Sequence, residues 1–426
     1  MNIIPSVKGT RDFYPENMRV RTWLYRTMAQ VSALFGYQEY DGPFLEYMDL
    51  YAAKSGEELI KEQAFVFQDR GGEWITLRPE LTPTLARMVA QKQRQLTYPL
   101  RWWSFGPMWR YERPQKGRSR EFFQWNIDLI GANSPEADAE LIAIGAVFLR
   151  SVGLVPEEVQ ILVNNRRLVD QTLEQLGIPA AQRPDVLRLI DRRDKMSPNA
   201  WRTYALETVG LAQAQFDGLC AALANDSLWR QSAELVRLFQ ALDALGVGAY
   251  ARYAPEIVRG LDYYTGTVFE ARDCDGEFRA ILGGGRYDNL VAAVGGEALA
   301  GVGFAMGDMV ITLVLEKFGR IPPVEMLQDS PILVTIFDES SRQASMRMAA
   351  TLREAGLPTV LYPEAIKLGK QLKYAERIGA ALAIIAGPDE LAAGQVTIKD
   401  LAHSTQQRVA QEHLVSVVAG LHSPGR

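Results

Sequence analysis

WSFGPMWRYERPQKGRSREFFQ, the stretch from Trp103 to Gln124, is the most informative part of this 426-residue sequence. An aromatic run with high β propensity enters a loop that holds most of the local cations, and a second aromatic run leaves the loop and ends at Asp128. This pattern predicts a strand, a cationic loop and a returning strand. Between Arg101 and Arg120 six cations face the single acid Glu112, whereas the whole chain has a formal net charge of −5. The loop therefore either binds something anionic or is an ordinary solvated hairpin tip.

The composition indicates a globular protein of more than one domain. Domains usually span roughly 100–200 residues, so a chain of this length is expected to hold two or three. Hydrophobic residues make up 47% of the sequence and charged residues 23%, which is usual for a globular chain. The negative net charge argues against indiscriminate binding of nucleic acid, but not against a partner bound at a local basic surface.

Cysteine and histidine usage restricts the possible chemistry. Cys220 and Cys274 are too far apart to suggest a disulfide framework or a cysteine zinc site. All three histidines, His403, His413 and His422, lie near the end of the chain, which excludes a histidine triad or metal centre in the main body. Chemistry there must use carboxylates, guanidinium groups, hydroxyls and backbone, and we predict no metal site built from protein side chains.

The amino terminus lacks the apolar run of a secretory signal, and no segment is long and uncharged enough to span a bilayer. We therefore expect a cytoplasmic protein without a membrane partner.

Local patterns predict a sheet assembled from both sides of a helical insertion. Residues 18–36 have the apolar spacing of an amphipathic helix, and residues 65–78 indicate a hairpin around a glycine turn. Residues 165–248 are rich in Leu and Ala without period-two alternation, which is typical of helices. Strand signals return at residues 253–272 and 278–282, and the glycine run that starts at Gly283 is interpreted as a turn.

A proline-rich linker at residues 322–331 precedes a separate small domain. Beyond it, short apolar runs alternate with helical patterns in a β-α-β-α-β order, which predicts an α/β domain. Lys367, Lys370, Lys373 and Arg377 recur there at helical spacing, either as a solvated helix face or as a surface for an anionic partner.

Four clusters of residues carry a resemblance to a known family. They are Leu77-Arg78-Pro79-Glu80-Leu81-Thr82-Pro83, the cationic stretch around Arg110, Val258-Arg259-Gly260-Leu261-Asp262-Tyr263-Tyr264-Thr265-Gly266-Thr267 and Gly283-Gly284-Gly285-Arg286-Tyr287-Asp288. In this order, with Lys8-Gly9-Thr10-Arg11-Asp12 before them, they resemble the histidyl-tRNA synthetases, which are class II aminoacyl-tRNA synthetases. The resemblance covers nearly the whole chain.

The resemblance implies an α+β fold in two domains. A six-stranded antiparallel sheet flanked by helices would form the catalytic core at residues 1–325, with the helical insertion inside it. An α/β anticodon-binding domain would occupy residues 331–426. A homodimer is also implied, with the early helix and the strand after it at the interface.

The implied activity is the activation of L-histidine by ATP and its transfer to tRNA(His). Activation asks the protein mainly for positioning and charge stabilisation, which suits a cluster of arginines. By resemblance, Arg110 contacts the α-phosphate, Glu112 the adenine region, Arg118 the outer phosphates, and Arg259 is the distinctive catalytic arginine. Arg286 is a further candidate for binding ATP, and Mg²⁺ bridges phosphate oxygens.

The implied histidine pocket contains six residues. By resemblance, Glu80, Thr82 and Gln124 hold the α-amino group, Asp128 and Tyr264 bind the imidazole nitrogens, and Tyr263 lines the same pocket. A buried carboxylate facing a ring N–H is a sensible partner for imidazole, because analogues without that donor leave it unpaired.

One segment departs from the family pattern. Where class II synthetases usually carry a Glu-Arg pair whose arginine grips the γ-phosphate, this chain has Met309-Val310. The charge then comes from another residue, with Arg286 or Arg118 as candidates, or ATP is bound more weakly.

The same catalytic core is also similar to a regulatory protein, the synthetase-like subunit of ATP phosphoribosyltransferase, which binds histidine without charging tRNA. The missing arginine favours this alternative. The terminal domain favours the synthetase, because an anticodon reader needs it and the subunit usually lacks it. The resemblance assigns Lys370, Lys373 and Arg377 to tRNA contact.

Overall fold

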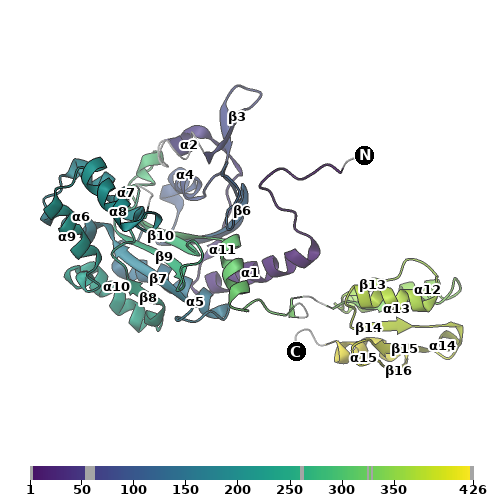
Figure 1. The fold of residues 1–426 in the computed structure, drawn as a ribbon. Coiled ribbons are helices and arrows are strands. Elements are labelled where there is room, and N and C mark those ends of the chain that lie inside the picture. The colour runs from purple at the N-terminus through teal and green to yellow at the C-terminus, as the bar shows by residue number, and fades with distance from the viewer. Residues whose placement is uncertain (1–2, 53–62, 260–262, 324–325, 328–329, 423–426) are drawn as a thin grey trace. The chain divides into compact units, whose positions relative to one another are not determined.

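The computed structural model of the chain describes residues 3–52, 63–259, 263–323, 326–327 and 330–422 (Figure 1). It divides into two units, Met1–Ile321 and Pro322–Arg426, and each has its own sheet and hydrophobic core.

The larger unit is built on an eight-stranded sheet of order β1-β5-β6-β11-β10-β9-β7-β8. The six strands from β5 to β7 in this order run antiparallel, which confirms the expected six-stranded sheet. Strands β1 and β8 add short parallel edges that the sequence did not predict as part of it. The bounds are β1 Gln38–Glu39, β5 Leu100–Trp109, β6 Glu121–Ile130, β11 Gly301–Gly307, β10 Leu282–Tyr287, β9 Thr267–Asp273, β7 Val159–Asn165 and β8 Ala251–Tyr253.

The predicted strand, cationic loop and returning strand are confirmed as β5 and β6. They are the longest strands of the sheet, and they pair along their whole length from Leu100 opposite Ile130 to Trp109 opposite Glu121. The aromatic and β-branched side chains of both strands favour this extended pairing. The sequence that joins them, residues 110–120, is therefore held at one end of the sheet.

Four helices cover one face of the sheet, and their buried side chains share one core with those of β6 and β9. They are α1 (Pro15–Leu34), α5 (Pro135–Ser151), α10 (Ala233–Ala244) and α11 (Asp308–Lys317). The Ser134 hydroxyl caps α5 by accepting a hydrogen bond from the Ala137 N–H, as its position before an acidic first turn predicts. Since these helices fill one face, Gln124 and Asp128 of β6 lie on the other.

The insertion is helical, as predicted. Between β7 and β8, helices α6 (Arg166–Gln175), α7 (Arg183–Asp191), α8 (Pro198–Thr203) and α9 (Gln213–Leu223) surround their own apolar cluster. Figure 1 shows these helices gathered at the end of the sheet formed by β7 and β8.

A small three-stranded sheet of order β2-β4-β3 precedes helix α4 (Thr82–Lys92). Its strands are β2 (Leu45–Tyr47), β3 (Phe65–Gln68) and β4 (Trp74–Leu77), and the short helix α2 spans Met48–Ala52. The hairpin of β3 and β4 turns at Gly72, which adopts a φ of 89°, and confirms the predicted glycine turn.

Two predictions about strands were wrong. The glycine run from Gly283 is not a turn, because it lies inside β10, a central strand of the sheet. Within the predicted strand at 253–272, the two ends belong to β8 and β9, whereas the described residues between them, 254–259 and 263–266, are not part of a strand. Glycine has low strand propensity, so the sequence pattern does not predict a strand that is rich in glycine.

The smaller unit has a five-stranded sheet of order β13-β12-β14-β15-β16. The first three strands are parallel, which confirms the predicted α/β domain, and the last two are antiparallel additions. The bounds are β12 Ile332–Val334, α12 Arg342–Glu354, β13 Thr359–Leu361, α13 Leu368–Arg377, β14 Leu382–Ile385, α14 Pro388–Ala392, β15 Gln395–Asp400, β16 Thr405–Ala410 and α15 Leu414–Leu421. Among the described helices of both units, none combines the length and apolar character that a membrane span requires.

Candidate functional site

A cavity of about 840 Å³ lies between the large sheet and the helical insertion. Its walls are formed by the β5–β6 connection, β9, the β9–β10 connection, the start of α11 and residues of the insertion. Its volume is within the usual range for a small-molecule site. Its lining includes the cations Arg110, Arg118, Lys195, Arg259, Arg272 and Arg279. The acids of the lining are Glu112, Asp191, Asp194, Glu270, Glu277 and Asp308.

Strand β6 positions two predicted residues by simple alternation. Gln124 and Asp128 lie on the same face, while Trp125 and Ile127 between them are buried in the core under the helices. Gln124 lines the cavity, and Asp128 is buried farther along the strand. The alternation of polar and apolar residues in β6 thus separates the site from the core.

Asp128 is a buried carboxylate with one direct hydroxyl partner. The Tyr287 hydroxyl donates a hydrogen bond of 2.5 Å to Oδ1 of Asp128. Burial raises the pKa of Asp128 to about 7, although the hydrogen bond from Tyr287 acts in the opposite direction. This carboxylate therefore changes its charge near neutral pH.

The two tyrosines predicted for the histidine pocket lie against each other beside Tyr287. The ring centroids of Tyr263 and Tyr264 are 4.9 Å apart, and Tyr263 makes an edge contact with Tyr287 at 6.2 Å. Burial, and secondly the charges of Tyr264 and Glu80, raise the pKa of Tyr263 well above its ordinary value. The rings thus connect Glu80 at one end of the cluster with Asp128 at the other.

Thr82 is the first residue of α4, and Glu80 is buried two residues before it. Of the six residues predicted to bind histidine, only Gln124 lines the large cavity. Glu80, Asp128 and Tyr264 are buried next to it, whereas Thr82 and Tyr263 are half-buried. The middle of the predicted motif, residues 260–262, lies outside the described residues.

Arg259 is held in an unusual backbone conformation at the edge of the cavity. Its φ is +49°, which is sterically unfavourable for a residue with a side chain. Its Nη1 is 2.9 Å from Oε2 of Glu270, and a second arginine, Arg272, also bonds to Glu270. Burial disfavours the charge, but the nearby Tyr264 and Glu270 outweigh this and raise the pKa of Arg259.

The glycines of β10 make room for these side chains. A Cβ on Gly283 would lie 1.7 Å from Nη1 of Arg259, and one on Gly285 would lie 2.8 Å from the Tyr264 ring. Any larger residue at these positions would displace Arg259 or Tyr264, so the glycine run serves the site and not a turn.

Arg110 directly follows β5 and lines the cavity. Its Nε donates a 2.9 Å hydrogen bond to the Pro79 carbonyl, and its guanidinium lies 5.4 Å from the Phe122 ring centroid. These contacts orient the guanidinium without neutralising it. Arg118, by contrast, is paired with Glu112 at 2.5 Å.

The structure does not support Arg286 as a ligand of ATP. Its Nη2 is 2.6 Å from Oδ1 of Asp138 in α5, and its side chain also donates to the Ala132 carbonyl. It is 3% exposed and is not part of the cavity lining. Because successive strand residues point to opposite faces, Tyr287 faces the site and Arg286 faces the helices.

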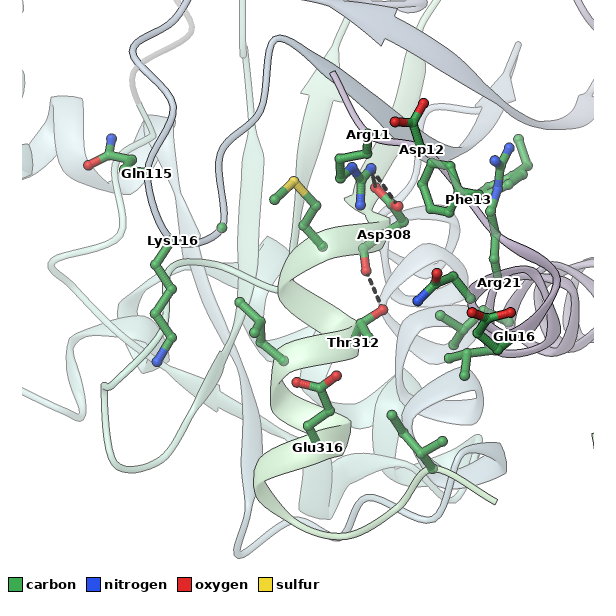
Figure 2. A pocket seen from close by; sticks show the side chains of 18 residues that line it. Arg11, Asp12, Phe13, Glu16, Arg21, Gln115, Lys116, Asp308, Thr312 and Glu316 are labelled. Atoms are coloured by element: carbon green, nitrogen blue, oxygen red, sulfur yellow. Dashed lines mark hydrogen bonds and ion pairs between the residues drawn. The ribbon is translucent and has the colours of Figure 1, made fainter. Parts of the chain in front are cut away.

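The first turn of α11 brings apolar side chains to the cavity. Met309 and Val310 line it, and Asp308 before them is paired with Arg11 at 2.8 Å. Figure 2 shows this pair in a second cavity, of about 790 Å³, on the α1 side of α11. Met309-Val310 therefore stands at the cavity in place of the Glu-Arg pair that is usual in class II synthetases, and no cation of α11 lines the cavity instead.

Sequence reasoning missed several residues of the site. Glu270 and Tyr287 hold Arg259 and Asp128, and the insertion contributes Asp191, Asp194 and Lys195 to the cavity wall. Asp194 also reaches Arg272 of β9 at 3.5 Å. Strand alternation identifies Tyr287 only once its segment is known to be a strand, and nothing in the sequence places the insertion over the sheet.

In the smaller unit, the four predicted cations lie together on the exposed side of α13 or just before it. None of Lys367, Lys370, Lys373 and Arg377 forms an ion pair with any residue that the structure describes. The buried face of α13 is fixed by Gln371, whose amide bonds to the backbone of Ile336 and Ile366.

Comparisons with known proteins agree with this geometry. The family description "Histidyl-tRNA synthetase" matches residues 9–309, and "Anticodon binding domain" matches residues 330–421. A histidine--tRNA ligase of Opitutus terrae is 39% identical over 99% of this chain and 100% of its own length.

Two solved structures share the fold. A histidyl-tRNA synthetase from Nostoc sp. PCC 7120 is similar over 99% of this chain and 100% of its own, with a TM-score of 0.83 at 24% identity. A protein from Bacillus halodurans, described as an ATP phosphoribosyltransferase regulatory subunit/histidyl-tRNA synthetase, covers 88% of this chain and 96% of its own, with a TM-score of 0.73 at 22% identity.

Proposed function

Because the chain belongs to the histidyl-tRNA synthetase family, we propose that it activates L-histidine with ATP and transfers the histidine to tRNA(His). The observation that carries the proposal is the pairing of a cation-lined cavity with the buried carboxylate of Asp128 next to it. One part suits a triphosphate and the other an imidazole N–H.

In the first step, a carboxylate oxygen of histidine attacks the α-phosphorus of ATP. The bond to the β-phosphate oxygen breaks, and pyrophosphate leaves with Mg²⁺, which enters with ATP as part of the substrate. Arg110 and Arg259 would stabilise the negative charge shared by the attacking carboxylate and the α-phosphate. Arg118 and Glu112 border the same cavity, and we assign them to the outer phosphates and the adenine region.

Histidine would be recognised by the buried cluster. Asp128 in its ionised form accepts the ring N–H, and Tyr264 supplies a hydroxyl for the second nitrogen. Glu80, Thr82 and Gln124 would hold the α-ammonium group, with Tyr263 as one wall of the pocket. The Tyr287 hydroxyl fixes the orientation of Asp128 before the substrate binds.

Transfer requires tRNA, and we assign its binding to α13 of the smaller unit. Lys370, Lys373 and Arg377 present positive charge without local neutralisation, as phosphate contacts require. The regulatory alternative has no use for such a unit. The free Cys220 and Cys274 suit a reducing compartment, and we propose a cytoplasmic location.

The proposal is tested on the purified full chain by ATP–pyrophosphate exchange and by charging of tRNA(His). We expect exchange that depends on histidine, followed by charging. In the variant Lys370→Glu/Lys373→Glu, exchange should be retained, while KM for tRNA should rise about tenfold or more because phosphate contacts are lost. Arg347→Glu on the exposed side of α12 is the matched control and should charge tRNA normally.

Tight histidine binding without exchange would replace the enzyme by the regulatory alternative. Equal loss of charging in the α13 variant and in Arg347→Glu would show an effect of net charge instead of a tRNA contact on α13.

We also propose a homodimer, supported by the outer face of the three-stranded sheet. Strand pairing places Leu45 and Leu77 opposite each other, and Tyr47 and Phe67 opposite Ile75. Phe65 completes this all-apolar face, while Glu46 and Thr76 point inward. Tyr47 is 62% exposed and Phe67 44%, and apolar faces of this kind are typical of protein interfaces.

The substitution Tyr47→Glu/Phe67→Glu should convert the dimer to monomers, because it places two charges in an apolar interface. Sedimentation velocity at micromolar concentration measures the outcome. Trp74→Glu, in the same hairpin but on the opposite face of β4, is the control and should remain dimeric. A wild-type chain that sediments as a monomer would refute the proposal directly.

A further inference from the structure

Among the described residues, the ion pairs of the large cavity leave two guanidinium groups without a carboxylate partner. Arg118 is paired with Glu112, Arg259 and Arg272 share Glu270, and Lys195 is paired with Asp191 at 2.8 Å. Within the described ranges, the one hydrogen bond of the Arg110 side chain goes to the Pro79 carbonyl. Arg279 forms no hydrogen bond or ion pair with any residue in the described part of the chain.

The segment that carries Arg279 is anchored in place. Asp273 at the end of β9 accepts hydrogen bonds from the backbone N–H groups of Glu277 and Phe278, at 2.9 and 3.1 Å. Lys317 of α11 pairs with Asp273 at 3.3 Å and with Asp275 at 2.7 Å. The connection from β9 to β10 is thus tied to α11, so the backbone at Arg279 is positioned before a ligand arrives.

The acid nearest to Arg279 in the sequence is neutralised by other groups. Glu277 pairs with Lys116 at 3.2 Å and with Lys317 at 3.3 Å, and the bond from Lys116 lowers its pKa. Its charge is consequently not available to Arg279, which keeps an uncompensated positive charge at the cavity wall.

Arg279 and Arg118 repel each other across this space. Burial, and next the charge of Arg118, lower the pKa of Arg279, and Glu112 offsets this only in part. Beside them the wall is apolar, because Val310 lies against the loop at Gly117, where an added Cβ would be 3.5 Å from it. The cavity thus has two guanidinium groups without a carboxylate partner, Arg110 and Arg279, and one that is paired, Arg118. A bound polyphosphate would neutralise the positive charge of such a group of arginines.

We propose that Arg279 binds the terminal phosphate of ATP and supplies the charge that Met309-Val310 does not provide. The assignment rests on the proposed function of the cavity as the ATP site. Arg110 and Arg279 line the same cavity from different segments, the β5–β6 and the β9–β10 connections, so we assign the α-phosphate to Arg110 and the γ-phosphate to Arg279. The guanidinium can bond two phosphate oxygens at once, and no proton is transferred.

The test measures the binding of ATP and of AMP to the full chain by titration calorimetry, with histidine binding as the check on folding. In Arg279→Ala we expect ATP to bind about tenfold more weakly, because one charge-assisted contact is lost, while AMP and histidine bind as before. Arg279→Lys should lose less. Arg252→Ala, an exposed arginine of β8 outside the cavity, is the matched control and should change nothing.

A second variant restores positive charge at another position of the cavity lining. Val310→Arg introduced into Arg279→Ala should recover at least part of the ATP affinity, since both positions border the same cavity. Unchanged ATP affinity in Arg279→Ala would overturn the assignment, and so would an equal loss of AMP and ATP, which would place Arg279 at the nucleoside. The absence of exchange in the wild-type chain would refute the proposed function, whereas these binding measurements test Arg279 without turnover.

Discussion

Replacing Arg259 by alanine is expected to lower histidine-dependent ATP–pyrophosphate exchange about 100- to 1000-fold, the usual cost of removing a preorganised charge from a transition state. Arg259 is fixed by Glu270, by the left-handed backbone and by the space that Gly283 leaves for it. A water molecule that fills the space of the Arg259 side chain in the alanine variant would not supply its positive charge. The exchange rate at saturating ATP and histidine is the quantity to measure.

The role of charge can be separated from backbone strain. Arg259→Gly removes the guanidinium and also relieves the unfavourable φ, so it should be more stable than Arg259→Ala yet equally inactive. Arg252→Ala is again the control, and circular dichroism checks the fold of each variant. Exchange within a few-fold of wild type in either Arg259 variant would disprove the catalytic assignment.

Replacing Asp128 by asparagine is expected to weaken histidine binding on the order of 100-fold, because a charged acceptor is exchanged for a neutral one. The pH dependence should also change. Since the pKa of Asp128 is about 7, the wild-type affinity should fall as the pH is lowered through 7 and the carboxylate is protonated. The imidazole of the ligand histidine titrates in the same pH range. The pH profile of histidine affinity is therefore measured for Asp128→Asn as well, where the carboxylate is absent, and is subtracted from the wild-type profile.

The same group predicts the pH dependence of stability. Its pKa is raised from 3.8 to about 7 on folding, so the folded chain holds a proton that the unfolded chain has released between these values. The resulting stabilisation is present below pH 3.8 and is lost as the pH rises through 7. Without ligand, Asp128→Asn should therefore gain stability relative to wild type between pH 5 and pH 8 in urea titrations. A difference that does not vary with pH would contradict the pKa of Asp128.

Much of the core could be predicted because its signals are local. In β6 the polar residues Gln124 and Asp128 alternate with Trp125 and Ile127, so the sequence alone separates the site face from the core face. The cationic loop, the hairpin at Gly72 and the helical insertion were predicted for the same reason. The loop and the hairpin are each predicted from some ten to twenty consecutive residues, the range over which periodicity is informative, and the insertion from its composition and the lack of period-two alternation.

The contacts of Arg286 could not be predicted from the sequence because the conformation of its neighbours depends on distant residues. The glycines from Gly283 to Gly285 have low strand propensity and suggest a turn, but they lie in a central strand. Arg259 and Tyr264 occupy the space beside Gly283 and Gly285, and Phe304 occupies the space beside Gly284. Once the segment is a strand, alternation turns Tyr287 toward Asp128 and Arg286 toward Asp138.

The sequence by itself determined the family, the order of elements and the residue types that ATP and histidine require. Tertiary structure alone decided which charges remain available, since an arginine is a ligand only if no carboxylate neutralises it. Asp138 takes Arg286 out of the site, whereas Lys116 and Lys317 occupy Glu277 and leave Arg279 unpaired. These pairings join residues up to 161 positions apart in the sequence. Because Coulomb attraction depends on the distance between charges in space, separation along the chain does not predict which charges pair.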